Sequence, residues 1–254
     1  MPRLRAMTCD LILPALDEER SIGAVLAALP PGVVRETVVV DNGSADGTAE
    51  IARAAGATVL HEPQRGYGRA CLTGLEHVAA QAQPPDVVAF LDADFSDHPE
   101  ELPDVLAPIM AGAADLVIGS RVLGQRAGRV ERGALLPQAR VGNALACALI
   151  RARWGVRFTD LGPFRAMRWP ALRDLGMADE TFGWTVEMQV RAVRAGLRTA
   201  EVPVSYRRRV GVSKITGTVS GTVRAGAKIL TTIGAHALRP APRAGGVAVL
   251  ARDG

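Results

Sequence analysis

The first 120 residues alternate between short apolar runs and segments with helical spacing, and this alternation constrains the fold more than any other feature. Apolar, often β-branched runs that indicate strands lie at residues 9–15, 36–41, 57–61, 86–92 and 114–120. Helical patterns separate them, including one that begins near the potential cap Ser21 and one from about residue 68 to 81. Because parallel strands need a crossover connection, the pattern predicts an α/β fold with a mostly parallel sheet flanked by helices.

Polar side chains follow each of the five apolar runs. In a parallel sheet, ligands bind outside the carboxyl ends of the strands, so these side chains are expected to face one crevice. In chain order they are Asp17 and Glu18, then Asp41, Asn42 and Ser44, then Arg65, then Asp92, Asp94 and Asp97, and finally Arg121. Carboxylates and arginines at successive strand ends predict a site for a charged ligand.

The run VVAFLDADFSD ends an apolar strand with Asp92 and Asp94, two carboxylates one residue apart. A divalent cation would offset their repulsion, and hard oxygen ligands suit Mg²⁺ or Mn²⁺. Such a metal keeps open positions for phosphate oxygens and would stabilise a departing diphosphate. The alternative is that Asp94 and Asp97 are ordinary turn or cap residues ahead of the helix at Pro99.

Three further motifs suggest a nucleotide pocket. Asp41 in VVVDNGSADGT could accept hydrogen bonds from a base, although Asn-Gly and Asp-Gly also form plain turns. In LPALDEE, Pro14, Ala15 and Glu18 could contact the nucleotide, or the acids could simply favour a helix start. Arg65 in EPQRGYGRA could reach a phosphate or lie in a flexible loop. That motif does not match the dinucleotide fingerprint, which argues against a nicotinamide dehydrogenase.

The second half is less regular. Helical patterns cover residues 137–151 and the run TVEMQVRAVRAG. The run TDLGPFRAM indicates a loop. The run LRTAEVPVSY indicates a strand, which Pro203 confines to an edge or makes irregular. We expect a catalytic domain at 8–215, an amphipathic helical segment at 216–238 and a disordered tail at 239–254. The segment's apolar stripe could rest on an anionic bilayer or pack against the catalytic domain.

Composition narrows the function classes. Arginine makes up 28 of the 30 basic residues, and its planar fork suits phosphate, although a GC-rich genome also favours arginine. Aromatic residues are only 4% of the chain, and no stacking platform indicates nucleic acid. Three widely spaced cysteines indicate buried thiols. No apolar run is long enough to span a membrane and no signal peptide is evident, so we expect a cytoplasmic protein, at most peripheral to the inner membrane face. The oligomeric state stays open.

These motifs together resemble the family 2 inverting glycosyltransferases with the GT-A fold. The likeness runs from about Cys9 to Lys214 and is strongest to dolichyl-phosphate mannose synthase and its bacterial polyprenyl-phosphate relatives. It rests on the order LPALDEE, VVVDNGSADGT, RGYGRA, LDADFSDHP, IGSR, TDLGPFRAM, WTVEMQVRA and RRRVGVSK. Two positions depart from the pattern: Asn42 replaces a second acid, and Asp97 replaces His or Gln.

The resemblance implies roles for individual residues. Those expected to line the nucleotide pocket are Pro14, Ala15, Glu18 and Asp41. Asp92 and Asp94 would meet the ribose, the diphosphate and the metal. Arginines at the positions of Arg121 and Arg140 receive the acceptor phosphate in dolichyl-phosphate mannose synthases. Arg209 and Lys214 would belong to a basic loop that closes over the donor diphosphate.

The reaction expected is a one-step transfer of a hexose, with inversion, from GDP-mannose or UDP-glucose to a polyprenyl phosphate or similar phosphorylated lipid. A phosphate monoester has a second pKa of about 6 and needs arginines rather than a base. A hydroxyl acceptor on a polysaccharide or small molecule would need a general base, for which Asp160 and Glu187 are the candidates. A sugar-phosphate nucleotidyltransferase would place a glycine-rich basic loop where DEER stands, and a non-catalytic sugar-binding relative would lack the paired acids.

Overall fold

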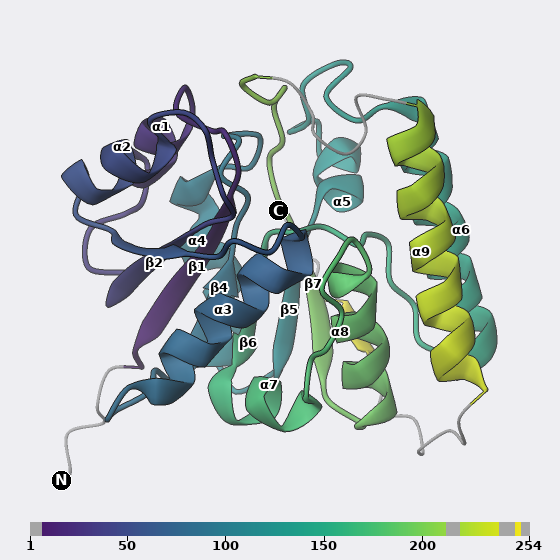
Figure 1. Cartoon of the computed structure of the whole chain (residues 1–254). Coiled ribbons are helices and arrows are strands. Elements are labelled where there is room, and N and C mark those ends of the chain that lie inside the picture. The colour runs from purple at the N-terminus through teal and green to yellow at the C-terminus, as the bar shows by residue number, and fades with distance from the viewer. Residues whose placement is uncertain (1–6, 212–218, 239–246, 250–254) are drawn as a thin grey trace, which may run out of the picture.

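The computed structural model describes residues 7–211, 219–238 and 247–249, and within these ranges the strands form one eight-stranded sheet (Figure 1). Across the sheet the strand order is β3-β2-β1-β4-β6-β5-β7-β8. In chain order the strands are β1 (Cys9–Ala15), β2 (Glu36–Asp41), β3 (Thr58–His61), β4 (Val87–Phe90), β5 (Leu116–Ser120), β6 (Arg165–Arg168), β7 (Thr199–Pro203) and β8 (Val247–Val249).

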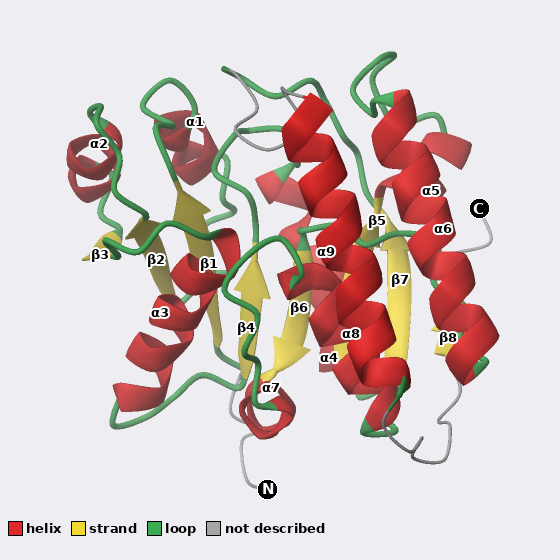
Figure 2. Ribbon diagram, turned by 45° about the vertical axis from the view of Figure 1, so that its right-hand side comes forward, coloured by secondary structure: helices red, strands yellow, loops and turns green. Residues whose placement is uncertain are grey.

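Helices connect the strands and cover both faces of the sheet, as Figure 2 shows. They are α1 (Ile22–Ala27), α2 (Thr48–Ala54), α3 (Tyr67–Ala80), the 3₁₀ turn Pro99–Glu101 with α4 (Leu102–Met110), α5 (Arg121–Arg126), α6 (Pro137–Trp154), α7 (Trp169–Leu175), α8 (Trp184–Arg194) and α9 (Val219–Ala237). All strand pairs are parallel except those of β6, which runs antiparallel to β4 and to β5. The predicted α/β class with a mostly parallel sheet is confirmed.

Two apolar layers lie on opposite faces of the sheet, and β1 contributes to both. Ile12 belongs to the layer shared with α3, α6 and α8, whereas Leu11 and Leu13 belong to the layer shared with α1 and α4. Side chains alternate between the two faces of a strand. A central parallel strand covered on both faces is therefore apolar throughout, which is why the sequence shows continuous runs.

The structure differs from the sequence-based expectation at β6, β7 and β8. β6 begins inside the predicted loop TDLGPFRAM and ends one residue beyond it. No strand was predicted there, because four residues carry no readable periodicity. β7 lies between β5 and β8 rather than at an edge, and Pro203 is its last residue, so the strand's other amides remain able to pair. β8 pairs with β7 inside the range predicted to be a disordered tail. The rest of that range, 239–246 and 250–254, lies outside the described residues.

The predicted C-terminal helix is α9, and it packs against α6 and α8. Ile233 is buried in the apolar layer that contains α6 and α8. Two arginines bind the last carbonyls of α9: Arg153 donates to Ala237 O at 2.9 and 3.1 Å, and Arg194 donates to His236 O at 2.8 Å. Cations at a helix C-terminus satisfy unpaired carbonyls and oppose the helix dipole. Of the helices described, none is both long and apolar enough to cross a membrane.

Candidate active site

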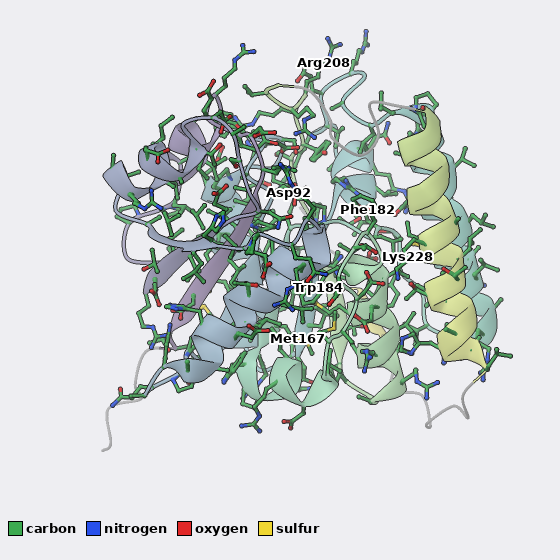
Figure 3. The ribbon with its side chains drawn as sticks, viewed as in Figure 1. Asp92, Met167, Phe182, Trp184, Arg208 and Lys228 are labelled. Carbon is green, nitrogen blue, oxygen red and sulfur yellow. The ribbon has the colours of Figure 1, made fainter. Side chains whose placement is uncertain are left out.

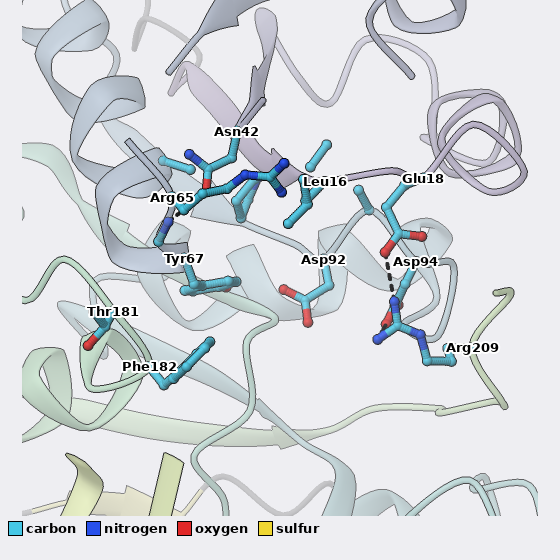
Figure 4. A pocket seen from close by; sticks show the side chains of 15 residues that line it. Leu16, Glu18, Asn42, Arg65, Tyr67, Asp92, Asp94, Thr181, Phe182 and Arg209 are labelled. Carbon is cyan, nitrogen blue, oxygen red and sulfur yellow. Dashed lines mark hydrogen bonds and ion pairs between the residues drawn. The ribbon is translucent and has the colours of Figure 1, made fainter. Parts of the chain in front are cut away.

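A cavity of about 360 Å³ opens at the carboxyl ends of β1, β2 and β4 (Figure 4). It brings together eight of the residues singled out from the sequence, namely Pro14, Ala15, Glu18, Asn42, Arg65, Asp92, Asp94 and Arg209. Further wall residues come from segments far apart in the chain, namely Leu16, Tyr67, Thr181 and Phe182. The predicted crevice therefore exists, and part of its wall comes from the loop between α7 and α8.

Asp92 stands in this cavity with its carboxylate turned inward (Figure 4). Its Oδ1 atom is buried and has no hydrogen-bond partner within the described chain. Burial, followed by the nearby charge of Asp94, raises the pKa of Asp92 from 3.8 to about 7. A cation seated against both acids would relieve the burial penalty and the repulsion. The two carboxylates thus fit a divalent metal.

Protein ligands alone would not complete such a metal site. Among the described residues, no three His, Cys, Asp or Glu side chains converge closely enough to hold a metal ion. Mg²⁺ is commonly bound through one or two carboxylates plus substrate phosphates and water. The pair Asp92 and Asp94 matches that mode, in which the ion and the phosphorylated ligand depend on each other.

Arg209 links the two acidic sides of the cavity. Its Nη2 donates to Glu18 Oε1 at 2.7 Å, and its Nη1 lies 3.3 Å from Asp94 Oδ2 (Figure 4). Asp94 also accepts hydrogen bonds from the backbone N–H and hydroxyl of Ser96. The Arg209 guanidinium therefore compensates the negative charges of two carboxylates in the cavity wall. It is a cation that could turn to the phosphates of a ligand.

The segment that carries Arg209 is bonded to the turn that carries the paired acids. Arg207 N donates to Ser96 O, and Val210 N donates to Asp94 O, both at 2.9 Å. The Arg207 guanidinium also lies 3.6 Å from the centroid of the Phe95 ring. Phe95 itself has a φ of 60°, a conformation that is rare for a bulky residue. Lys214, the other predicted cation of this basic loop, lies outside the described residues.

At the nucleotide end, Asp41 is not among the residues that line the cavity. Its Oδ1 accepts from the backbone N–H of Ser44, three residues further on, at 2.9 Å. A contact between Asp41 and a base stays a prediction. Asn42, the next residue, lines the cavity instead. Its amide donates to Glu62 O and Gln64 O and accepts from Gly66 N, so it shapes the loop that carries Arg65. Successive side chains at the end of β2 point to opposite sides, which explains why Asn42 and not Asp41 lines the cavity.

The glycines of RGYGRA allow a close backbone contact that the sequence did not reveal. Gly68 N and Arg69 N, in the first turn of α3, donate to Thr181 O and Glu180 O at 3.1 and 2.9 Å. A Cβ on Gly68 would lie 1.9 Å from Asp179 O, and one on Gly66 would lie 2.2 Å from Glu180 O. The glycines therefore admit the backbone of residues 179–181, and these amides are not free to bind a phosphate.

Residues 178–183 form a loop, here called the wall loop, that presents Thr181 and Phe182 to the cavity. Asp179 organises it by accepting from Thr181 N at 2.8 Å and Gly183 N at 3.1 Å. Lys228 on α9 lies 3.0 Å from Asp179 Oδ2, and Figure 3 shows Lys228 on the side of α9 toward Phe182. The C-terminal helix therefore helps to hold one wall of the site.

On the other side of Asp92, Arg121 begins α5 and binds Asp160 through its backbone and its guanidinium, with all three distances at 2.8 Å. Its guanidinium also lies 5.2 Å from the Tyr206 ring centroid. Arg140, predicted to act with Arg121, lies on the exposed surface of α6 and does not line the cavity. Arg121 does not line the cavity either, and a role for the two arginines toward an acceptor phosphate stays a prediction.

Comparison with known protein families identifies the arrangement. A model of the family described as glycosyl transferase family 2 matches residues 10–175. This chain belongs to glycosyltransferase family 2. An uncharacterised glycosyltransferase of Mycobacterium tuberculosis is 40% identical over 215 residues, covering 84% of this chain and 92% of its own. The undecaprenyl-phosphate mannosyltransferase of Micrococcus luteus is 33% identical over 225 residues, covering 83% and 88%.

Solved structures show the same fold as this glycosyltransferase. One is the glucosyl-3-phosphoglycerate synthase of Mycobacterium tuberculosis in complex with Mn²⁺, UDP and phosphoglyceric acid. It superposes with a TM-score of 0.71 at 25% identity, covering 92% of this chain and 80% of the other. The predicted GT-A fold and the predicted glycosyltransferase class are both confirmed.

In this glycosyltransferase, the two candidate general bases are occupied by structural contacts. Glu187 on α8 accepts from Ala178 N and Asp179 N through Oε2, and from Arg191 through Oε1 at 2.8 Å. It therefore holds the wall loop and does not line the cavity. Both carboxylate oxygens of Asp160 accept hydrogen bonds from Arg121. Their contacts indicate positioning roles. The proton transfer that a hydroxyl acceptor would require of them stays a prediction.

A third acid, Asp97, differs from these two in the surroundings of its carboxyl group. Both oxygens of Asp97 are buried and have no hydrogen-bond partner within the described residues. Burial, followed by the charge of Asp92, raises the pKa of Asp97 well above its ordinary value. Two sequence signals marked it, namely its place after the fourth apolar run and its departure from the family motif. The wall residues Tyr67, Thr181 and Phe182 gave no such signal, because aromatic and hydroxyl side chains are common in any segment.

Proposed function

We propose that this enzyme transfers a hexose from a nucleoside-diphosphate sugar to the phosphate of a polyprenyl phosphate, with inversion and with bound Mg²⁺ or Mn²⁺. The observation that carries the proposal is the meeting of Asp92, Asp94 and Arg209 at one side of a cavity large enough for a nucleotide. The relative named as an undecaprenyl-phosphate mannosyltransferase supports the acceptor class. The glucosyl-3-phosphoglycerate synthase, crystallised with Mn²⁺ and UDP, supports the metal and the nucleotide.

The cavity wall suggests how the donor is oriented. The nucleoside would lie against Pro14, Ala15 and Asn42, which line the cavity. The diphosphate would then lie toward Asp94 and Arg209. A metal held by Asp92 and Asp94 would supply Lewis-acid stabilisation of the leaving diphosphate. Arg209 would exchange its contacts with Glu18 and Asp94 for a phosphate oxygen and so add positive charge where negative charge develops.

The transfer itself needs no general base when the acceptor is a phosphate. An acceptor oxygen forms the bond to the anomeric carbon while the bond from that carbon to the diphosphate oxygen breaks, and the electron pair leaves with the nucleoside diphosphate. Because the phosphate is already largely a dianion near neutral pH, no proton has to move. We assign this role to Arg121, whose charge acts on Asp92 and whose guanidinium is held in place by Asp160.

One observation favours a second candidate, a glycosyltransferase that uses a hydroxyl acceptor. The carboxyl group of Asp97 is buried without a hydrogen-bond partner among the described residues, and this burial raises its pKa well above the ordinary value. A hydroxyl acceptor requires a group that takes its proton. Replacing Asp97 by Asn separates the two candidates, because it should abolish transfer to a hydroxyl and leave transfer to a phosphate within about tenfold.

The experiment that tests the proposal is a donor panel followed by an acceptor panel. Calorimetry with UDP-glucose and GDP-mannose, with and without Mn²⁺, identifies the donor. Turnover is then measured with a short-chain polyprenyl phosphate and with the matching free polyprenol. Asp94→Asn should lower turnover at least about 100-fold. Asp174→Asn, at an exposed position, is the matched control. Equal turnover of the polyprenol and its phosphate would disprove the proposed acceptor.

A further inference from the structure

Helix α6 has two apolar faces, and the described parts of the chain cover one of them and leave the other exposed. Its inner face packs into the core and is formed by Ala146, Cys147, Ile150 and Trp154. Val141, Leu145 and Leu149 follow each other at intervals of four residues on the opposite face and are 69%, 47% and 36% exposed. Three exposed alanines at 144, 148 and 152 continue this surface. We call these six residues the outer stripe.

The outer stripe is surrounded by positive charge. Residues 121–157 contain eight arginines and a single acid, Glu131. Six of the arginines are exposed, namely Arg126, Arg129, Arg132, Arg140, Arg151 and Arg157. Glu131 is itself engaged by Arg208, whose Nε lies 3.3 Å from its carboxylate. A contiguous apolar strip with basic flanks marks an interaction surface. A suitable partner has an apolar interior that accepts the strip and anionic groups at its surface that bind the arginines.

We propose that the outer stripe of α6 docks on the surface of an anionic lipid bilayer. Leucine and valine side chains would enter the boundary between headgroups and acyl chains, while the flanking arginines would bind lipid phosphates. A second copy of this chain is a poorer occupant, because facing stripes would bring arginine against arginine. Docking would not require the proposed acceptor, but it would explain how the enzyme reaches a lipid phosphate.

α6 also connects directly to the acceptor side of the site. Asn143, on α6, donates to Thr159 O and accepts from Leu161 N, both at 2.8 Å. These two residues flank Asp160, which binds Arg121. Figures 1 and 2 show α6 and α9 side by side at one end of the sheet, where α6 is not covered by another helix on its outer side. A bilayer against α6 would therefore lie one loop away from Arg121.

The test is flotation of the full chain with vesicles of phosphatidylcholine alone or mixed with phosphatidylglycerol, without donor or acceptor. We expect binding to the mixed vesicles only. A triple variant, Val141→Ser with Leu145→Ser and Leu149→Ser, should bind about 100-fold more weakly. Met110→Ser, which alters a 60% exposed apolar side chain on α4, should bind as the parent does. Arg151→Gln should lower binding about fivefold, and high salt should weaken the parent.

Three results would overturn the proposal. These are equal binding of the triple variant and the parent, no binding of the parent to anionic vesicles, and a dimer in solution that the triple variant converts to monomer. The activity test stays separate, because the triple variant should turn over a water-soluble short-chain polyprenyl phosphate as the parent does. If no form of the enzyme uses a polyprenyl phosphate while vesicle binding persists, the proposed acceptor fails and the docking surface stands.

Discussion

Arg121 and Asp160 form a pair in which one carboxylate accepts three hydrogen bonds from one arginine, two through its side chain and one through its backbone, all at 2.8 Å. Only 18% of the Arg121 side chain and 2% of the Asp160 side chain are exposed. A bidentate pair of this kind fixes the orientation of the guanidinium. Asp160 therefore determines where the Arg121 guanidinium points.

We expect Asp160→Asn to act through Arg121. Removing one partner of a buried ion pair leaves an uncompensated charge and should cost on the order of 3 kcal/mol of unfolding free energy. The acceptor kcat/KM should fall about tenfold or more, because the guanidinium loses its orientation. The shape of the pH–rate profile should not change. A profile that loses its acidic limb in the variant would instead identify Asp160 as a general base.

Replacing Arg209 should change the affinities for the metal and for the donor in opposite directions. Because it compensates Asp94 and Glu18 in the ligand-free enzyme, Arg209→Gln should let Mn²⁺ alone bind about tenfold more tightly. The same variant should raise the donor KM about 10- to 100-fold, since a charged hydrogen bond to the diphosphate is lost. Calorimetry and steady-state kinetics measure the two effects, with the exposed neighbour Arg208→Gln as control. A decrease in both affinities would show that Arg209 does not compete with the metal.

Because of Glu201, on β7, we expect the folded protein to lose stability as the pH rises. Its carboxyl group is fully buried and accepts from Thr159 N and Asp160 N. Burial raises the pKa of Glu201 from 4.5 to about 7. The folded state therefore favours the protonated form, and the stability it gains below pH 4.5 is lost as the pH rises through about 7.

Glu201→Gln should remove this pH dependence, because glutamine mimics the protonated acid at every pH. Between pH 5 and pH 8 the parent should lose on the order of 3 kcal/mol more than the variant. In thermal unfolding, that corresponds to about 6–12 °C in Tm. Parallel curves for the two proteins across this range would mean that Glu201 is ionised in the folded protein.

The glycines of α3 and α6 should respond in opposite ways to alanine. Gly68→Ala places a Cβ 1.9 Å from Asp179 O, so we expect a loss of about 1–3 kcal/mol and a higher donor KM as the wall loop moves. Gly142→Ala meets nothing within 4 Å and should stabilise α6 by about 0.5–1 kcal/mol. Chemical denaturation and donor kinetics test both. A neutral Gly68→Ala variant would contradict the close approach of residues 179–181.

Much of the fold and half of the site follow from local sequence patterns. Continuous apolar runs indicate buried parallel strands, and the acids after 86–92 indicate a metal and phosphate site, because both features depend on residues adjacent in the chain. The same reasoning located Pro14, Glu18, Arg65 and Asp92 correctly at one cavity. It failed at β6, whose four residues are too few to show a period.

The sequence by itself determined the alternating architecture, the family and the paired acids at the end of a buried strand. Only the tertiary structure decided what each polar group contacts. It placed Arg209 between Glu18 and Asp94, joined Arg121 to Asp160, used Glu187 to hold the wall loop, and left Arg140 on the outside of α6. These contacts join residues far apart in the chain. No local periodicity encodes them, because burial and charge compensation are set by the packing of whole elements.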